Sequence, residues 1–156
     1  SFGGQLALLL AARYPVLGVF ATATPCVLKF PFNIPGLEIL GLFKKTWKKR
    51  LTPEEIENRK NSFYYHRMPS SGLTLVKQAN KLIAQSASAI TCPLLLFHST
   101  RDRLAAQKSV SWVTSQAGSA IKKTVILNND KHGIFYSGHE NIVAQTIADF
   151  THAHCL

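Results

Sequence analysis

Two short apolar segments constrain the fold of this chain more than any other feature of its sequence. Residues 16–23 and 94–98 are apolar and partly β-branched, without the alternating polar residues that mark a strand with one exposed face. Each segment therefore predicts a strand that is buried on both faces, as in a parallel sheet. Residues 123–127 predict a third, shorter strand.

Helical patterns surround these strands. Residues 3–14 are mostly strong helix formers that end before Pro15, and residues 73–86, 105–117 and 139–152 carry apolar side chains at helical spacing. Strands that alternate with helices predict an α/β fold, with a parallel sheet of about three strands flanked by helices.

Residues 26–85 interrupt this alternation. Residues 36–50 carry apolar side chains at helical spacing, and residues 52–55 are typical of the start of a second helix, which would run to about residue 63. We therefore expect residues 1–25 and 86–156 to form the core, and residues 26–85 to form a helical cap and the helix that returns from it.

The net charge of +10 favours an anionic partner, but its distribution argues against nucleic acid. Many of the cations lie in one stretch, residues 44–50, which is typical of a solvated helix face, and no nucleic-acid-binding motif accompanies it. The apolar run 6–12 is too short to cross a bilayer, so we expect no stable membrane insertion.

The three cysteines lie far apart in the sequence. Their number is odd and no C-x-x-C motif occurs, so the sequence predicts neither a disulfide framework nor a zinc site. The cysteines are Cys26, Cys92 and Cys155. Unpaired cysteines are typical of a reducing compartment, and we expect the protein to be cytoplasmic.

Three chemically active side chains stand where the strands meet loops. Ser1-Phe2-Gly3-Gly4 matches the second half of the pattern G-x-S-x-G, a serine on a strand-to-helix turn. Asp102 follows the strand at 94–98, and His132 follows the strand at 123–127. Because the carboxyl ends of parallel strands share one edge of a sheet, these residues are expected to meet there.

Each of the three residue types has a role in nucleophilic catalysis. A serine hydroxyl needs a base to remove its proton, an imidazole is suited to that task near neutral pH, and a carboxylate orients the imidazole. The order Ser, Asp, His along the chain is that of α/β-hydrolase triads. The backbone N–H of Phe2, at the start of the helix, would be one oxyanion donor.

Other interpretations of these residues remain open at this point. Asp102 could cap the following helix, and Asp130 is a rival acid, although it stands only two residues from His132. His98 ends a strand near the site and is expected to pack or form a local hydrogen bond. Ser1 could also be an N-terminal nucleophile that uses its own amine as the base. The remaining histidines are expected at the surface: His66, His139, His152 and His154.

The chain resembles the α/β-hydrolases, and in particular small bacterial carboxylesterases and monoacylglycerol lipases. The resemblance rests on Ser1-Phe2-Gly3-Gly4, on residues 92–98 through Asp102, and on Lys131-His132-Gly133-Ile134. It implies that the chain is the C-terminal part of a hydrolase, without the N-terminal strands or the loop that supplies a second oxyanion donor. Lys131 departs from the family, which usually has Gly before the histidine. The resemblance implies no cofactor and no metal.

These features together predict a serine hydrolase that cleaves short- to medium-chain acyl esters through an acyl-enzyme. The alternatives are a related thioesterase, lipase or peptidase, and a degenerate hydrolase that acts as a basic binding module. Phe30, Phe32 and Trp47 are predicted to bind substrate, although aromatic residues of the cap could equally pack cap against core. Without its N-terminal strands the isolated chain is expected to be inactive or nearly so. The cap aromatics are Phe30, Phe32, Phe43, Trp47, Phe63, Tyr64 and Tyr65.

Overall fold

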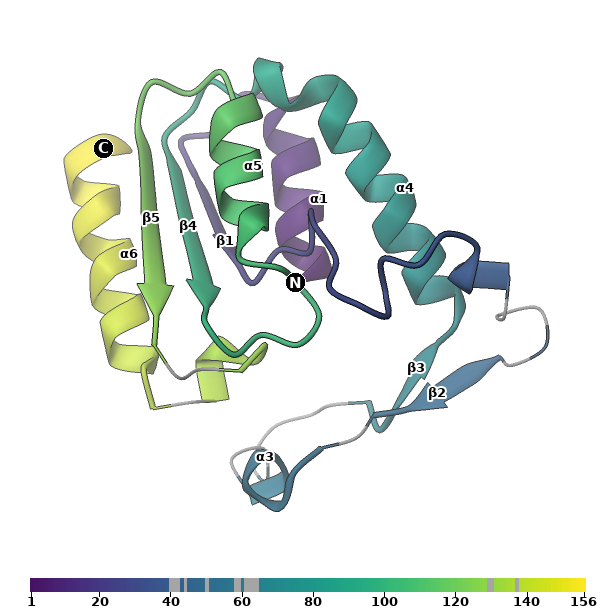
Figure 1. Cartoon of the computed structure of the whole chain (residues 1–156). Coiled ribbons are helices and arrows are strands. Elements are labelled where there is room, and N and C mark those ends of the chain that lie inside the picture. Colours follow the sequence, from purple (N-terminus) through teal and green to yellow (C-terminus); the bar gives the residue numbers. More distant parts are fainter. Residues whose placement is uncertain are drawn as a thin grey trace.

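A parallel sheet of three strands, in the order β1–β4–β5, forms the middle layer of the molecule (Figure 1). The strands are β1 (Val19–Thr22), β4 (Leu94–Ser99) and β5 (Lys122–Leu127). Val19 is opposite Leu94, and Leu94 is opposite Lys122. This computed structural model describes residues 1–39, 43, 45–49, 51–57, 60, 65–128, 131–136 and 138–156.

Both faces of the central strand β4 are buried, which explains why its sequence does not alternate. Leu94 and Leu96 pack in one apolar cluster with side chains of α1, α4 and α5. Leu95 and Phe97 pack on the opposite face, in a cluster that includes side chains of α6. Full burial of each such side chain contributes about 1.5–3 kcal/mol to folding. The predicted α/β fold, with a parallel sheet of about three strands flanked by helices, is therefore confirmed.

The four helices predicted around the sheet are present, with different ends. They are α1 (Phe2–Ala11), α4 (Ser71–Ser86), α5 (Lys108–Gln116) and α6 (Glu140–His154). Helix α1 ends at Ala11, before Pro15. Helix α5 begins three residues later than predicted because Ala105 forms a β-bridge with Leu28 and is held as loop. Short 3₁₀ turns cover Leu37–Ile39, Ala87–Ala89 and Ile134–Tyr136.

The helix predicted over residues 36–50 is wrong at residues 46–48, where the cap forms a strand instead. Strand β2 (Thr46–Lys48) pairs antiparallel with β3 (Arg67–Pro69), and this two-stranded ribbon projects from the core (Figure 1). Thr46 and Trp47 favour strands, and a helix would have placed the like charges of Lys45 and Lys49 on one face.

Only part of the second predicted cap helix is described. Helix α3 covers Pro53–Glu57, so the predicted helix start is confirmed. Residues 40–42, 44, 50, 58–59 and 61–64, which include Phe63 and Tyr64, lie outside the described part of the chain. None of the helices within the described ranges is long and apolar enough to span a bilayer.

One glycine allows α1 to approach β1 closely. A Cβ atom on Gly4 would lie 2.3 Å from Thr24 Oγ1 and 3.4 Å from Ala21 Cβ, whereas a Cβ on Gly3 would meet nothing within 4 Å. Of the two neighbouring glycines, only Gly4 therefore permits this packing.

Gly4→Ala is therefore expected to destabilise the full-length protein that carries this sequence. The added methyl group must displace the buried Thr24, and overpacking of this kind costs about 1–3 kcal/mol in the free energy of unfolding. Gly3→Ala is the matched control, since it should be neutral or stabilise the helix by up to about 1 kcal/mol. Urea denaturation measures both variants, and equal stability of the two would contradict the packing described here.

Candidate functional site

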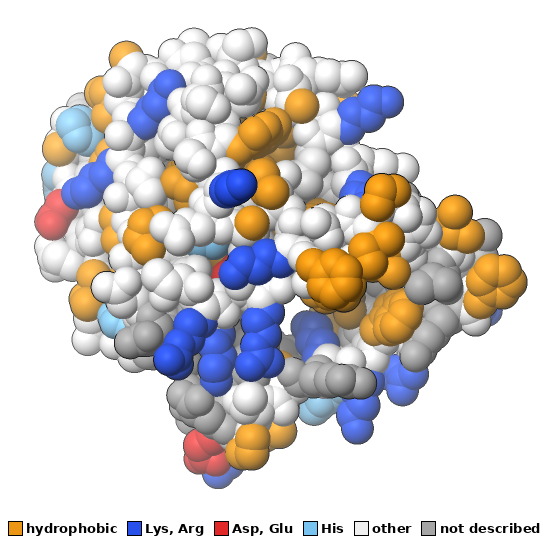
Figure 2. Space-filling view, in the orientation of Figure 1, with side chains coloured by type: hydrophobic (Ala, Val, Ile, Leu, Met, Phe, Trp, Pro, Cys, Tyr) orange, Lys and Arg blue, Asp and Glu red, His pale blue; other side chains and the backbone are white. Residues whose placement is uncertain are grey.

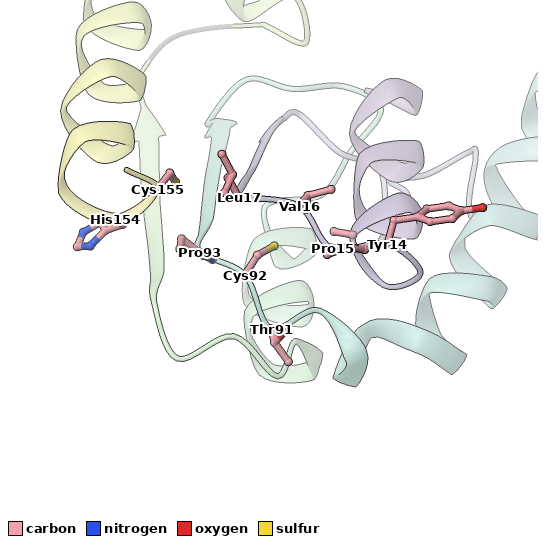
Figure 3. A pocket seen from close by; sticks show the side chains of 10 residues that line it. Tyr14, Pro15, Val16, Leu17, Thr91, Cys92, Pro93, His154 and Cys155 are labelled. Atoms are coloured by element: carbon pink, nitrogen blue, oxygen red, sulfur yellow. The ribbon is translucent and has the colours of Figure 1, made fainter.

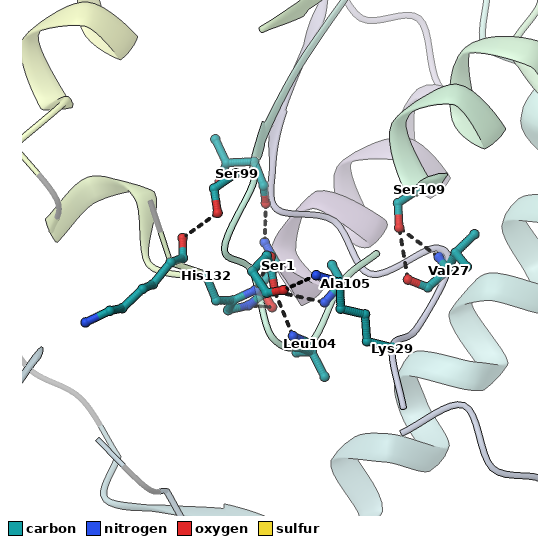
Figure 4. A network of polar contacts seen from close by, with 11 residues as sticks. Ser1, Val27, Lys29, Ser99, Leu104, Ala105, Ser109 and His132 are labelled. Carbon is teal, nitrogen blue, oxygen red and sulfur yellow. Dashed lines mark hydrogen bonds and ion pairs between the residues drawn. The ribbon is translucent and has the colours of Figure 1, made fainter. Parts of the chain in front are cut away.

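Ser1, His132 and Asp102 form one continuous chain of hydrogen bonds (Figure 4). Ser1 Oγ lies 2.8 Å from His132 Nε2, and His132 Nδ1 lies 2.8 Å from Asp102 Oδ2. The carboxylate can only accept here, so Nδ1 carries the proton and Nε2 accepts from the serine hydroxyl. The structure thus brings together the three side chains that the sequence predicted to meet.

Each of these side chains is held at the carboxyl end of a strand. Ser1 stands directly before α1, its nitrogen donates to the carbonyl oxygen of Thr22 at the end of β1, and its carbonyl oxygen accepts from Gly4 N–H at 2.9 Å. Asp102 follows β4 and His132 follows β5. Ser1 is solvent-exposed and His132 is partly exposed, so a molecule from solution can reach the serine oxygen.

The Asp102 carboxylate is buried and has hydrogen-bond partners on both oxygens. Its Oδ1 accepts from the backbone N–H groups of Leu104 at 2.7 Å and Ala105 at 2.9 Å, while Oδ2 accepts from His132. Burial alone would raise the pKa of Asp102, but the hydrogen bonds and the charge of His132 outweigh it and hold this pKa below its ordinary value. One oxygen of Asp102 therefore holds its own loop and the other orients His132. The alternative that Asp102 caps the following helix is wrong, because α5 begins at Lys108 and its N-cap residue is Gln107.

A segment after β1 fixes the Asp102 loop from the other side. Lys29 N–H donates to the Leu104 carbonyl at 2.9 Å, and the Lys29 ammonium donates to the Asp102 carbonyl at 2.6 Å. Ser109 Oγ accepts from Val27 N–H at 2.9 Å and donates to the Val27 carbonyl at 3.1 Å (Figure 4). No motif in the sequence indicates these contacts, which join residues more than 70 positions apart.

The loop that carries His132 has its own anchor. The buried Ser99, at the end of β4, donates from Oγ to the carbonyl oxygen of Lys131 at 2.9 Å. This bond fixes the backbone next to His132. Ser99 was not singled out from the sequence, although a polar residue at the end of a buried strand is a detectable signal.

None of the other candidate histidines within the described residues takes part in this chain of hydrogen bonds. His98 is fully buried in β4, and neither of its ring nitrogens has a hydrogen-bond partner among the described residues. Burial lowers its pKa, partly offset by the charge of Asp102, so it is a neutral packing residue. Asp130, the rival acid, lies outside the described residues. His66, His152 and His154 are exposed, and His139 is half-buried.

The predicted substrate-binding aromatics come from two parts of the cap. Phe30, which is 77% exposed, and the half-buried Phe32 follow Lys29 in the loop after β1. Trp47 lies in β2, opposite Met68. Phe2, the predicted oxyanion donor, is the first residue of α1, where backbone N–H groups have no acceptor within the helix.

A pocket of about 340 Å³ lies away from this site (Figure 3). Its walls come from residues that precede β1 and β4 and from the end of α6, at the opposite edge of the sheet. Burial raises the pKa of Cys92 in its wall, which disfavours a reactive thiolate there. Within the described ranges, no group of three or more His, Cys, Asp or Glu side chains could hold a metal ion.

The low pKa of Asp102 predicts a pH-dependent contribution to stability. Its folded-state pKa lies below the ordinary value of 3.8, so the charged carboxylate stabilises the fold above that pH and this stability is lost as the pH falls through the folded-state pKa. Asp102→Asn should therefore be less stable than the unmodified full-length protein at neutral pH, and the difference should shrink below about pH 4. Urea denaturation at several pH values measures this, and a difference that does not change with pH would contradict it.

Comparisons with known proteins agree on the fold. No protein-family model matches the chain, and no curated protein matches it. Among solved structures, the chain is similar to the monoacylglycerol lipase of Paleococcus ferrophilus (17% identity, TM-score 0.79), covering 99% of this chain and 66% of that one. It is also similar to a metagenome-derived lipolytic enzyme, with 16% identity and a TM-score of 0.77, covering 97% of this chain and 62% of that one. A third similar structure is a monoglyceride lipase from Saccharomyces cerevisiae, with 17% identity and a TM-score of 0.74, covering 99% of this chain and 63% of that one.

These neighbours are lipases that share one architecture, and the chain spans less than two thirds of the length of each. At such low identity the likeness concerns the arrangement of strands and helices alone. The chain has the α/β-hydrolase fold.

Proposed function

We propose that the full-length protein that carries this sequence is a serine hydrolase of carboxylic esters with short- to medium-chain acyl groups. The observation that carries the proposal is the unbroken chain of hydrogen bonds from Ser1 Oγ through His132 to the buried Asp102, with both contacts at 2.8 Å. The lipolytic activity named for its structural neighbours supports an ester substrate in general.

In the first half of the reaction, the acyl group moves to the serine. His132 Nε2 takes the hydroxyl proton as Ser1 Oγ attacks the ester carbonyl carbon, which becomes a tetrahedral oxyanion. Asp102 keeps its charge, holds the Nδ1–H tautomer and stabilises the imidazolium. The carbon–oxygen bond to the alcohol then breaks, and the alcohol leaves with the proton from Nε2.

In the second half, water takes the place of the serine hydroxyl. His132 Nε2 removes a proton from the water, which attacks the acyl-serine, and the proton then returns to Ser1 Oγ as the acid leaves. The Phe2 N–H at the start of α1 is proposed as one oxyanion donor, because an unpaired N–H group at a helix start favours negative charge.

The acyl chain is proposed to lie against cap aromatics. Phe30 is largely exposed and directly follows Lys29 in the chain, and the Lys29 ammonium donates to the Asp102 carbonyl, so the backbone at Phe30 passes near the Asp102 loop. Phe32 and Trp47 are proposed to extend it. The alternatives within the fold, a thioesterase, a lipase or a peptidase, differ in the leaving group and use the same three residues.

Three free cysteines support a cytoplasmic location.

Ser1→Ala in the full-length protein should abolish hydrolysis of a p-nitrophenyl ester while leaving the protein folded. Loss of the nucleophile removes the acyl-enzyme route, which lowers kcat by roughly 10⁶-fold in enzymes of this type. The control is Ser111→Ala, because Ser111 is an exposed serine of α5. Retained hydrolysis by Ser1→Ala would contradict the proposal, and a folded native protein with no activity would favour a degenerate hydrolase.

The isolated 156-residue chain is expected to aggregate and to hydrolyse esters slowly or not at all. Within the described residues, β1 pairs on one side only, and nearby apolar side chains are exposed: Leu10 by 54% and Leu17 by 73%. An open strand edge beside apolar surface promotes association. Size-exclusion chromatography with an ester assay tests this, and a monomeric, active product would contradict it.

A further inference from the structure

Each of the three strand-end loops around the Ser1 site carries at least one cationic residue. Lys29 belongs to the loop after β1, Arg101 and Arg103 flank Asp102 after β4, and Lys131 precedes His132 after β5. We call these four residues the cationic rim. Because Asp102 and His132 are linked to Ser1 through contacts of 2.8 Å, their chain neighbours lie within a few residue spacings of the serine.

The carboxylate at the centre of the rim does not neutralise it. Both oxygens of Asp102 are occupied by His132 and by two backbone N–H groups. The Lys29 ammonium contacts the backbone oxygen of Asp102, and in the described part of the chain no carboxylate forms an ion pair with Lys29, Arg101 or Arg103. Arg101 and Arg103 are exposed and available to a ligand.

Further cationic side chains lie on the surface around the rim. Figure 2 shows Lys and Arg side chains gathered where the strand-end loops face the β2–β3 ribbon, with few acidic side chains among them. The ribbon and its flanks contribute the exposed Lys45, Lys48, Lys49 and Arg67. Charges of one sign on both sides of a site add their fields and raise the local concentration of anions.

We propose that the cationic rim selects esters that carry a carboxylate or phosphate group. The inference rests on the proposed function, because it names the class of ester that the Ser1 site receives. The acyl carbon reaches Ser1 Oγ while the anion of the same molecule binds the guanidinium groups of Arg101 and Arg103, which match carboxylate and phosphate geometry. Phe30, next to Lys29, offers an apolar surface to the acyl chain.

A matched pair of soluble esters tests the proposal on the full-length protein. 4-(Butyryloxy)benzoate is anionic, and its methyl ester is neutral with the same acyl group. We expect kcat/KM for the anionic ester to exceed that for the neutral ester by about tenfold at low salt, and the ratio to fall towards one at about 1 M NaCl, where charges are screened.

Two double variants locate the effect. Arg101→Gln with Arg103→Gln should lower the anionic-to-neutral ratio to about one. Lys81→Gln with Lys123→Gln removes the same charge from exposed positions in α4 and β5, away from the site, and should leave the ratio unchanged. A ratio of one in the unmodified protein, a ratio that salt does not change, or an equal loss in both variants would overturn the proposal. The salt dependence of the unmodified protein decides the matter if the arginine variant does not fold.

Binding separates this inference from the proposed function. If neither ester is hydrolysed, the proposed function fails, and calorimetric titration of the same two esters into Ser1→Ala then tests the rim alone. Preferential binding of the anionic ester, lost with the two arginines, supports the inference, and equal binding overturns it. Sedimentation with phosphatidylglycerol or phosphatidylcholine vesicles distinguishes a lipid source. Binding to anionic vesicles without any preference between the soluble esters would assign the rim to a membrane surface and overturn the proposal.

Discussion

The rest of the site depends on the hydrogen bonds that the buried carboxylate of Asp102 accepts. One of its oxygens orders its own loop through Leu104 and Ala105, and the other orients His132. A carboxylate buried to 1% exposure is costly unless hydrogen bonds replace its water, and here they do so on both oxygens. The same bonds that stabilise the charge therefore fix the imidazole towards Ser1.

That carboxylate is held in place by the central strand. β4 is buried on both faces and is paired on both edges, so the loop that follows it starts from the most constrained position in the sheet. The contacts of Lys29 and Ser109 brace the loop from the β1 side, and Ser99 braces the neighbouring His132 loop. The exposed serine is thus supported by a rigid framework.

The residues that could be predicted from the sequence are those with local signals. In the strand at residues 94–98, apolar residues do not alternate with polar ones, which indicates burial on both faces. Asp102 and His132 follow the ends of predicted strands. The contacts between Lys29 and the Asp102 loop could not be predicted, because no motif marks Lys29 and nothing local links it to a residue 73 positions away. The β2–β3 ribbon could not be predicted either. Its segment has apolar residues at helical spacing, but strand pairing with distant residues, such as Trp47 with Met68, stabilises an extended backbone there instead.

The central claim is that Ser1 Oγ is the nucleophile activated by His132. Reaction of the full-length protein with a fluorophosphonate, followed by proteolysis and mass spectrometry, tests it most directly because the reagent reports which oxygen is activated. We expect one phosphonylated residue, Ser1, with no labelling in His132→Ala. Labelling of another residue, or a folded protein that is not labelled at all, would contradict it.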